Sequence, residues 1–372
     1  MTQMEQAKSF KICLVSISLA GGGAERSCAM LSGMLTNLGH QVHLVILNDE
    51  IDFKFQGKLF NLGKLKDIND HSLKRFLRFR KLRNYLIEEN FDVIIDHRSK
   101  NDYLRELFYD QFIYSSLKRI YVIHSSDKES YFTKSANKMA TIYNKNVTNV
   151  SVSDYIKNKI ALKLGVEKCE VIYNAFDSDW ENASNKILSE IENKTYILSY
   201  GRIDDSVKDF SFLIKSFQES KVWENDVSLV IMGDGKDKEN LKKLVAKLPC
   251  KEFVVFLPFN SNPFSIIKKA KFVTLTSKYE GFPMVLVETL SMGIPVVSLD
   301  IVSGPSEIIN HKENGLLIKK REVSLFAEAL HIMCTNIELY EYCKSNTKSS
   351  VQKFSDKIIA EQWNQLLQNE LH

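Results

Sequence analysis

The stretch KFVTLTSKYEGFPMVLVETLSMGIPVV, residues 271–297, predicts a β-strand, a loop, an α-helix and a second strand in succession. Its two ends belong to short runs, residues 271–277 and 294–300, that are rich in apolar and β-branched residues, as strands are. Pro283 suits the first turn of a helix, so we expect the helix to begin near it. A strand, a helix and a strand in this order predict two parallel strands with the helix packed on the sheet.

Two glutamates take defined places in this unit. Glu280 falls in the loop at the carboxyl end of the first strand, and Glu288 falls on the helix. Parallel α/β sheets bind their ligands beyond the carboxyl ends of the strands. We therefore expect the two carboxylates to hold hydroxyl groups on two parts of one elongated ligand. The backbone N–H groups of Phe282, Met284 and Val285 would face a bound anion.

Strand-like runs alternate with helical stretches along the rest of the chain. They cover residues 11–19, 41–47, 91–97, 119–125, 147–153 and 169–174, and then 195–202, 227–235, 252–259, 271–277 and 294–300. The polar stretch 178–194 between the two groups is a candidate hinge. This pattern predicts an α/β protein with two doubly wound, Rossmann-like parallel-sheet domains and an inter-domain cleft. We expect domains at residues 1–185 and 186–355, followed by an amphipathic helix at 356–372 that packs back on the first domain.

The composition narrows the class of protein. The chain has 372 residues, 44% of them hydrophobic and 26% charged, as in soluble globular proteins. Its net charge of +4 does not indicate a nucleic-acid partner. The N-terminus lacks the pattern of a secretory signal, and no apolar run approaches the length of a membrane span. The six cysteines have no metal-ligand or disulfide spacing, so we expect free thiols and a cytoplasmic location.

A glycine-rich loop, SLAGGGAER, follows the first predicted strand and opens a helix. It resembles a dinucleotide fingerprint, but Arg26 stands where that motif has its third glycine, which argues against a dinucleotide. Glycine backbone N–H groups at the start of a helix can approach an anion, so the loop predicts a phosphate site. A permissive turn without a ligand is the alternative.

Two cations, Arg202 and Lys208, follow the predicted strand at residues 195–202. Arginine offers a planar fork of donors and lysine a point charge, a combination that suits a diphosphate. These cations and the two glutamates would meet at the carboxyl ends of successive strands.

With these residues in place, the chain resembles a GT-B-fold retaining glycosyltransferase of the family-4 type, among the glycosyl transferases group 1. The resemblance spans nearly the whole chain and rests on seven segments: GGGAER, VIYNAFD (171–177), GRIDDSVK (201–208), GDG (233–235), VVFLPF (254–259), EGFPMVLVE (280–288) and GPSEIINHKENGLLI (304–318). Of these, the glutamate motif is the most specific.

The resemblance implies a role for each matching residue. Glu280 would bind the donor sugar and act in catalysis together with His124, Arg202 and Lys208, and Glu288 would bind the ribose. Arg202 and Lys208 would hold the diphosphate, and Gly22 and Gly23 would approach it from the other domain. The remaining predicted donor contacts are Pro258, Phe259, Phe282, Pro283, Met284 and Val285, of which the first two would pair with the base through the backbone. No cofactor or metal is expected, because the cations stabilise the leaving group.

The resemblance assigns residues 1–185 to the acceptor and residues 186–355 to the nucleotide sugar. Asp96, His97 and Arg98 end a strand of the first domain, where they would either bind the acceptor or close the strand through local hydrogen bonds. Residues 71–86 carry six cations and no acid among interleaved apolar residues. This helix would contact an anionic membrane on its inner face, or it is an ordinary solvated helix.

The function predicted in this way is transfer of a sugar from a nucleotide-sugar donor to a glycan or lipid-linked acceptor in cell-surface polysaccharide synthesis. A UDP-sugar is the favoured donor, with GDP-sugars left open. The alternatives are a non-catalytic nucleotide-sugar-binding protein and a GT-B-fold epimerase. The donor sugar, the linkage and the oligomeric state do not follow from the sequence.

Overall fold

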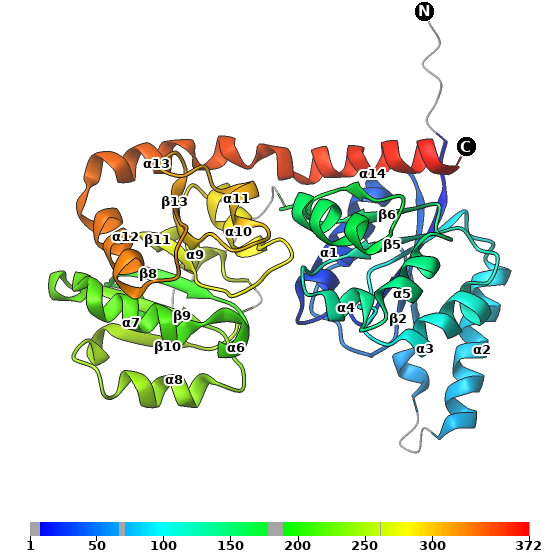
Figure 1. Ribbon diagram of the computed structural model, residues 1–372, viewed down its shortest axis with the longest axis horizontal. Coiled ribbons are helices and arrows are strands. Elements are labelled where there is room, and N and C mark those ends of the chain that lie inside the picture. Colours follow the sequence, from blue (N-terminus) through cyan, green and yellow to red (C-terminus); the bar gives the residue numbers. More distant parts are fainter. Residues whose placement is uncertain (1–7, 67–70, 178–188, 261, 372) are drawn as a thin grey trace, which may run out of the picture. The chain divides into compact units, whose positions relative to one another are not determined.

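The computed structural model describes residues 8–66, 71–177, 189–260 and 262–371. The chain forms two compact units, Met1–Ala175 with Asp356–His372 and Phe176–Ser355, each built around one parallel sheet (Figure 1). The domain boundary predicted between residues 185 and 186, and most of the predicted hinge, lie outside the described residues.

The sheet of the N-terminal unit has seven strands in the order β3-β2-β1-β4-β5-β6-β7, and every pair is parallel. The strands are β1 (Lys11–Ser16), β2 (Gln41–Ile46), β3 (Lys58–Asn61), β4 (Val93–Asp96), β5 (Arg119–Ile123), β6 (Thr148–Ser151) and β7 (Glu170–Val171). The chain runs outward from β1 in one direction and, from β4, in the other. The topological switch point, where such sheets bind ligands, therefore lies between β1 and β4.

The sheet of the C-terminal unit repeats this plan with six parallel strands in the order β10-β9-β8-β11-β12-β13. The strands are β8 (Thr195–Tyr200), β9 (Val227–Met232), β10 (Val254–Leu257), β11 (Phe272–Leu275), β12 (Val296–Leu299) and β13 (Gly315–Ile318). Its switch point lies between β8 and β11.

Helices lie in most of the connections between successive strands, as is usual for parallel pairing; the connection from β2 to β3, residues 47–57, contains none. In the N-terminal unit they are α1 (Gly23–Asn37), α2 (Ser72–Glu88), α3 (Tyr103–Phe108), α4 (Lys128–Phe132), α5 (Ala136–Tyr143) and α14 (Asp356–Leu371), with π-helical turns at Tyr109–Tyr114 and Ile156–Ala161. In the C-terminal unit they are α6 (Asp205–Lys208), α7 (Phe210–Ser220), α8 (Lys238–Val245), α9 (Phe264–Lys269), α10 (Met284–Ser291), α11 (Pro305–Ile308), α12 (Val323–Thr335) and α13 (Ile337–Ser350).

Each predicted strand run contains an observed strand, and two observed strands were not predicted. The two are β3 and β13, and each forms one edge of its sheet. Residues of β3 are only half-buried or exposed, so its sequence KLFN lacks the apolar run of an inner strand. The sequence of β13, GLLI, is four residues long and follows a turn without a clear boundary signal.

The core of the C-terminal unit lies between its sheet and the packed pair α7 and α12. Ile197, Leu229 and Ile231 of the sheet, with Phe217 of α7 and Phe326 of α12, are almost completely buried there. In the N-terminal unit α14 contacts α1, and His40 hydrogen-bonds Asn364 across 3.3 Å. Trp363 and Leu367 are among the buried residues of α14.

None of the helices in the described residues is both long enough and apolar enough to cross a membrane. All six cysteine thiols are free, and Cys334 alone among them is only half-buried.

Candidate active site

The C-terminal unit brings the predicted cations and Glu280 to its switch point. Arg202 and Lys208 follow β8, and Glu280 follows the neighbouring strand β11. The Nζ atom of Lys208 lies 2.6 Å from Oε1 of Glu280, and the Ser277 hydroxyl donates to the same oxygen at 2.7 Å. Arg202 is exposed. Lys208 and Glu280 are thus paired at this sheet edge, and Arg202 follows the strand that leads to Lys208.

Arg321, which the sequence analysis missed, ties the two loops together. Its guanidinium donates to Asp209 Oδ2 at 2.8 Å, to the carbonyl of Thr276 at 2.9 Å and to the carbonyl of Ser277. Asp209 immediately follows Lys208 and has a positive φ of 52°. Arg321 follows β13, a strand that was not predicted, so no sequence signal placed it near the site.

Two glycines in the GDG segment hold the Arg202 loop close to the next strand. A Cβ atom on Gly233 would lie 1.9 Å from the carbonyl oxygen of Gly201, and one on Gly235 would lie 2.2 Å from that of Ile203. Real Cβ contacts are never that short, so only glycine allows the two loops to approach. The sequence motif therefore has a packing reason.

The predicted base-binding segment, Pro258 and Phe259, follows β10 on the same sheet edge. The backbone N–H of Phe259 donates to Asp234 Oδ2 at 2.8 Å, and Lys238 pairs with the other oxygen of Asp234 at 2.6 Å. The Phe259 ring is 53% exposed. Because Asp234 engages this N–H group, a base would have to use the other backbone groups of the segment.

Glu288 lies on α10 and is held by Tyr200 from the end of β8. The Tyr200 hydroxyl donates to Glu288 Oε2 at 2.8 Å, and both side chains are buried. Tyr200 was not predicted as a site residue, although it stands two residues before Arg202. Its hydrogen bond fixes the carboxylate in one orientation.

The helix α10 begins at Met284, with Pro283 as its N-cap, close to where the sequence placed it. The first N–H groups of a helix, here including Met284 and Val285, have no acceptor inside the helix. Gly304 covers this end: a Cβ there would lie 2.2 Å from Cδ of Pro283, and its φ is +96°. The Ser303 hydroxyl donates to the Gly281 carbonyl at 2.7 Å. These contacts hold the Gly-Phe-Pro turn that contains Phe282.

The glycine loop of the N-terminal unit leads from β1 into α1, at that unit's own switch point. Gly21 has a φ of +75°, Gly22 is the N-cap of α1 and Gly23 its first residue. A Cβ on Gly23 would touch nothing within 4 Å, so the loop is open on that side. On Gly22 a Cβ would meet the carboxylate of Glu25, whose oxygen would lie 2.0 Å away.

Asp96, Arg98 and Lys100 form a buried ionic cluster at the end of β4. Arg98 donates to Asp96 from its backbone at 2.9 Å and from Nη2 at 2.7 Å, and it also reaches Glu106 at 3.1 Å. Burial opposes ionisation of Asp96, but the charges of Arg98 and Lys100 hold the pKa of its carboxyl below the usual range. Burial lowers the pKa of Lys100 to about 8. These contacts match the expectation that Asp96 and Arg98 close the strand; direct contact with an acceptor stays a prediction.

His97 and His124 stand side by side at the ends of β4 and β5. Nδ1 of His97 lies 3.0 Å from Nε2 of His124, and the rings are stacked with centroids 5.1 Å apart. Burial lowers the pKa of His97 to about 3 and that of His124 well below its ordinary value. Both rings are therefore neutral near pH 7, and one donates to the other. The sequence singled out both residues without relating them.

The basic helix α2 has one buried face and one exposed face, and each carries cations. Arg78, Leu82 and Leu86 are buried, and Arg83 donates to the carbonyl of Phe112 at 2.9 Å. Exposed residues near its start combine charge and apolar surface: Leu73, Lys74, Arg75, Phe76, Leu77, Arg80 and Lys81. Of residues 71–86, only the exposed ones could contact a membrane surface.

In the described residues, no three His, Cys, Asp or Glu side chains are grouped in a way that could hold a metal ion.

Two family models match successive parts of the chain. Glycosyltransferase Family 4 matches residues 21–180, and Glycosyl transferases group 1 matches residues 181–350. The chain belongs to the group 1 glycosyltransferases of the GT-B type.

Curated relatives of this group 1 glycosyltransferase match nearly its whole length. It is 28% identical over 371 residues, 94% of this chain and 96% of the relative, to the N-acetylgalactosamine-N,N'-diacetylbacillosaminyl-diphospho-undecaprenol 4-alpha-N-acetylgalactosaminyltransferase of Campylobacter jejuni. It is 24% identical to the amylovoran biosynthesis glycosyltransferase AmsD of Erwinia amylovora, over 93% of this chain and 96% of that one.

Among solved structures, Anabaena HepE in complex with UDP and glucose has the same fold. The TM-score is 0.77 at 20% sequence identity, covering 96% of this glycosyltransferase and 99% of that chain. The predicted family and the GT-B fold are confirmed, and the chain is an enzyme of glycosyl transfer in the synthesis of polysaccharides or lipid-linked sugars.

Proposed function

We propose that this glycosyltransferase transfers a sugar from a UDP-sugar to a glycan or lipid-linked acceptor with retention of the anomeric configuration. The C-terminal unit would bind the nucleotide sugar and the N-terminal unit the acceptor. The UDP in the HepE complex supports the donor class. The diphospho-undecaprenol in the name of the Campylobacter relative supports a lipid-linked acceptor.

The observation that supports this proposal is the Lys208–Glu280 ion pair at the switch point between β8 and β11, with Arg202 following the same strand β8. A nucleoside diphosphate leaves with additional negative charge, and fixed cations at that position stabilise it in the transition state. Lys208 and the exposed Arg202 would supply that charge in this chain. The positive groups would then take the role that divalent metals have in other transferases, so we propose transfer without a metal.

Glu280 would accept hydrogen bonds from hydroxyl groups of the donor sugar. Its carboxylate is already oriented by Ser277 and Lys208, so it loses little freedom when the sugar binds. Glu288, held by Tyr200, would accept from the ribose hydroxyls in the same way. With attack on the face from which the diphosphate leaves, no covalent intermediate with the enzyme is needed. The predicted donor contacts of Gly22, Gly23 and His124 stay predictions.

The Glu280→Gln variant tests the proposal. Removing one preorganised donor to the charge that develops in a transition state lowers kcat about 10²- to 10³-fold, and we expect a loss of that order for Glu280→Gln because it removes the carboxylate that holds Lys208 in place. The assay is UDP release from a panel of UDP-sugars, measured without acceptor and with a lipid-linked acceptor. Glu239→Gln is the matched control, because it removes a Glu–Lys pair of 2.8 Å on the exposed helix α8 of the same unit. A Glu280→Gln rate equal to that of wild type, with Glu239→Gln also unchanged, would refute the assignment.

Retention has a separate test. With an α-linked UDP-sugar, the proton NMR spectrum of the early product should show an α-glycoside. A β-glycoside would establish inversion and contradict this part of the proposal.

We further propose that the start of α2 contacts an anionic membrane, which would bring the enzyme to a lipid-linked acceptor. Lys74, Arg75, Arg80 and Lys81 are exposed beside Phe76, which is 43% exposed. A lysine or arginine near an anionic surface contributes about 1 kcal/mol to binding. Replacing Arg80 and Lys81 by Gln should therefore lower binding about 30-fold.

Flotation with vesicles of anionic and of neutral lipid measures this. The control exchanges Lys242 and Lys243 of α8 for Gln, which changes the net charge equally. If wild-type protein does not float with anionic vesicles at physiological salt, the membrane proposal is wrong.

A further inference from the structure

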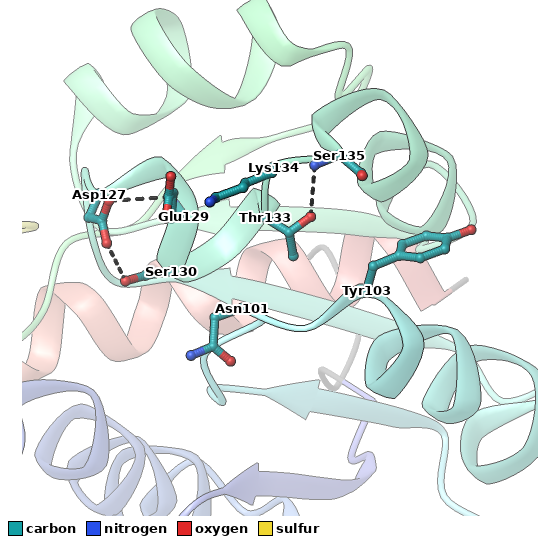
Figure 2. A pocket seen from close by; sticks show the side chains of 8 residues that line it. All are labelled: Asn101, Tyr103, Asp127, Glu129, Ser130, Thr133, Lys134 and Ser135. Carbon is teal, nitrogen blue, oxygen red and sulfur yellow. Dashed lines mark hydrogen bonds between the residues drawn. The ribbon is translucent and has the colours of Figure 1, made fainter.

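The N-terminal unit contains a cavity of about 540 Å³ at the carboxyl edge of its sheet (Figure 2). Sites for small molecules typically measure about 300–1,000 Å³, so the cavity has room for a ligand of that size. It is formed by the loop after β4 and the start of α3, by the loop after β5 and helix α4, and by the turn that follows α4. None of its lining residues was predicted from the sequence as a site residue.

The two loops that begin with His97 and His124 also contribute to the lining of the cavity. Asn101 lies four positions after His97 on the loop from β4, and Asp127 lies three positions after His124 on the loop from β5. The backbone N–H of Lys100 donates to the carbonyl of Ser130 at 2.8 Å, which joins the two loops. Parallel sheets bind ligands beyond these strand ends, so the cavity lies where a substrate of this unit is expected.

The polar groups of the lining include both acceptors and donors. Asp127 is fixed as the N-cap of α4, accepting from the Glu129 N–H at 3.2 Å and from the Ser130 hydroxyl at 2.6 Å. Carboxylates have about four acceptor sites in all, so both Asp127 and the exposed Glu129 can accept further hydrogen bonds.

Other residues of the lining supply hydrogen-bond donors. The Asn101 oxygen accepts from Arg105 at 2.9 Å, which leaves the NH₂ group of Asn101 to donate. The Thr133 oxygen accepts from the Ser135 N–H at 3.0 Å and keeps its own proton for donation. Lys134 extends from this turn in the direction of Glu129 in Figure 2.

The charges of the lining distinguish between classes of ligand. Asp127 and Glu129 bring two negative charges and Lys134 one positive charge, so the lining is net negative. A diphosphate would meet two carboxylates and gain one cation, which is unfavourable. A neutral ligand with many hydroxyl groups can donate to the carboxylates and accept from Asn101, Thr133 and Lys134.

We propose that this cavity binds a neutral sugar residue of the acceptor, with Glu129 and Asp127 accepting from its hydroxyl groups. The inference rests on the proposed function, in which the N-terminal unit takes the acceptor. It deepens that function by separating the sugar of a lipid-linked acceptor, held here, from the diphosphate, which this cavity repels.

The first test measures binding of neutral probes to the full-length protein. Methyl α-glycosides of glucose, galactose, N-acetylglucosamine and N-acetylgalactosamine are titrated and followed by saturation-transfer NMR. Glu129→Gln should weaken the tightest of them about tenfold or more, because a hydrogen bond to a charged group becomes a neutral one. Glu167→Gln, an exposed glutamate elsewhere in this unit, should leave binding unchanged.

The second test separates this inference from the proposed function. Release of UDP from a panel of UDP-sugars, with and without a lipid-linked acceptor, is measured for wild type and for the control Glu167→Gln, which should stay within twofold of wild type. If wild type releases no UDP from any UDP-sugar even with a lipid-linked acceptor, the proposed function is refuted, whereas the glycoside titration tests the cavity. The inference is overturned if no glycoside binds wild-type protein, if Glu129→Gln binds as wild type does, or if inorganic pyrophosphate displaces the glycoside.

Discussion

Replacement of Tyr200 by Phe tests how the buried Glu288 is held ready for the donor. The change removes one hydroxyl, which donates to Glu288 across 2.8 Å, and keeps the ring in place. A hydrogen bond to a charged group contributes about 1.5–3 kcal/mol, so the free energy of unfolding should fall by that amount. Glu288 would also regain side-chain freedom, whose loss on binding costs about 0.5–1.5 kcal/mol. The Kd for UDP should therefore rise about 2- to 12-fold.

Tyr196→Phe is a matched control on the same strand. Its hydroxyl donates to the carbonyl of Ile266 at 2.6 Å, away from Glu288. That bond is neutral, so the expected loss of stability is about 0.5–1.5 kcal/mol, with no change in UDP affinity. Isothermal titration with UDP and urea unfolding measure the two effects. The reasoning is refuted if Tyr200→Phe binds UDP as tightly as wild type, or if Tyr196→Phe weakens binding equally.

Three further predictions concern the loops around both switch points. Arg321→Leu should lower the free energy of unfolding by about 1–3 kcal/mol and should lower donor turnover, because the guanidinium no longer donates to both Asp209 and Ser277. Unchanged urea unfolding and unchanged turnover would contradict this prediction. Gly233→Ala should lower the free energy of unfolding by about 2–6 kcal/mol, because its Cβ clashes with the Gly201 carbonyl and the backbone is strained. The control Gly23→Ala, whose Cβ would meet no atom within 4 Å, should unfold at the same temperature as wild type. In the folded protein the pKa of His97 is about 3, whereas in the unfolded chain it is near 6.5. The free energy of unfolding of wild type should therefore fall by about 1.4 kcal/mol more than that of His97→Gln for each pH unit of acidification below about pH 6. Urea unfolding between pH 7 and 5 measures this, and the same pH dependence in both proteins would refute the prediction.

Local signals in the sequence were enough to predict the two-domain α/β fold. Inner parallel strands are buried on both faces, so they appear as short apolar runs such as KICLVS and VSLVIM. The edge strand β3 lacks such a run because solvent reaches it, and it was missed. The start of α10 at Met284 followed from the position of Pro283.

The positions of the charged candidate residues followed from the sequence for a related reason. Arg202, Lys208 and Glu280 come directly after strands, and parallel strands deliver their carboxyl ends to one edge. Their partners could not be found in this way. Arg321 is 112 positions from Asp209 and Tyr200 is 88 positions from Glu288, so each contact exists only once the sheet has assembled.

The sequence by itself thus determined the family, the alternation of strands and helices, and the strand ends that carry the chemistry, because each is encoded within a few neighbouring residues. Only the tertiary structure decided which side chains form ion pairs and hydrogen bonds with one another. It buried Asp96 and Arg98 in an ionic cluster, and it paired His97 with His124 at 3.0 Å. Burial and pairing depend on residues distant in the chain, and these are brought together only by the order of strands in the sheet.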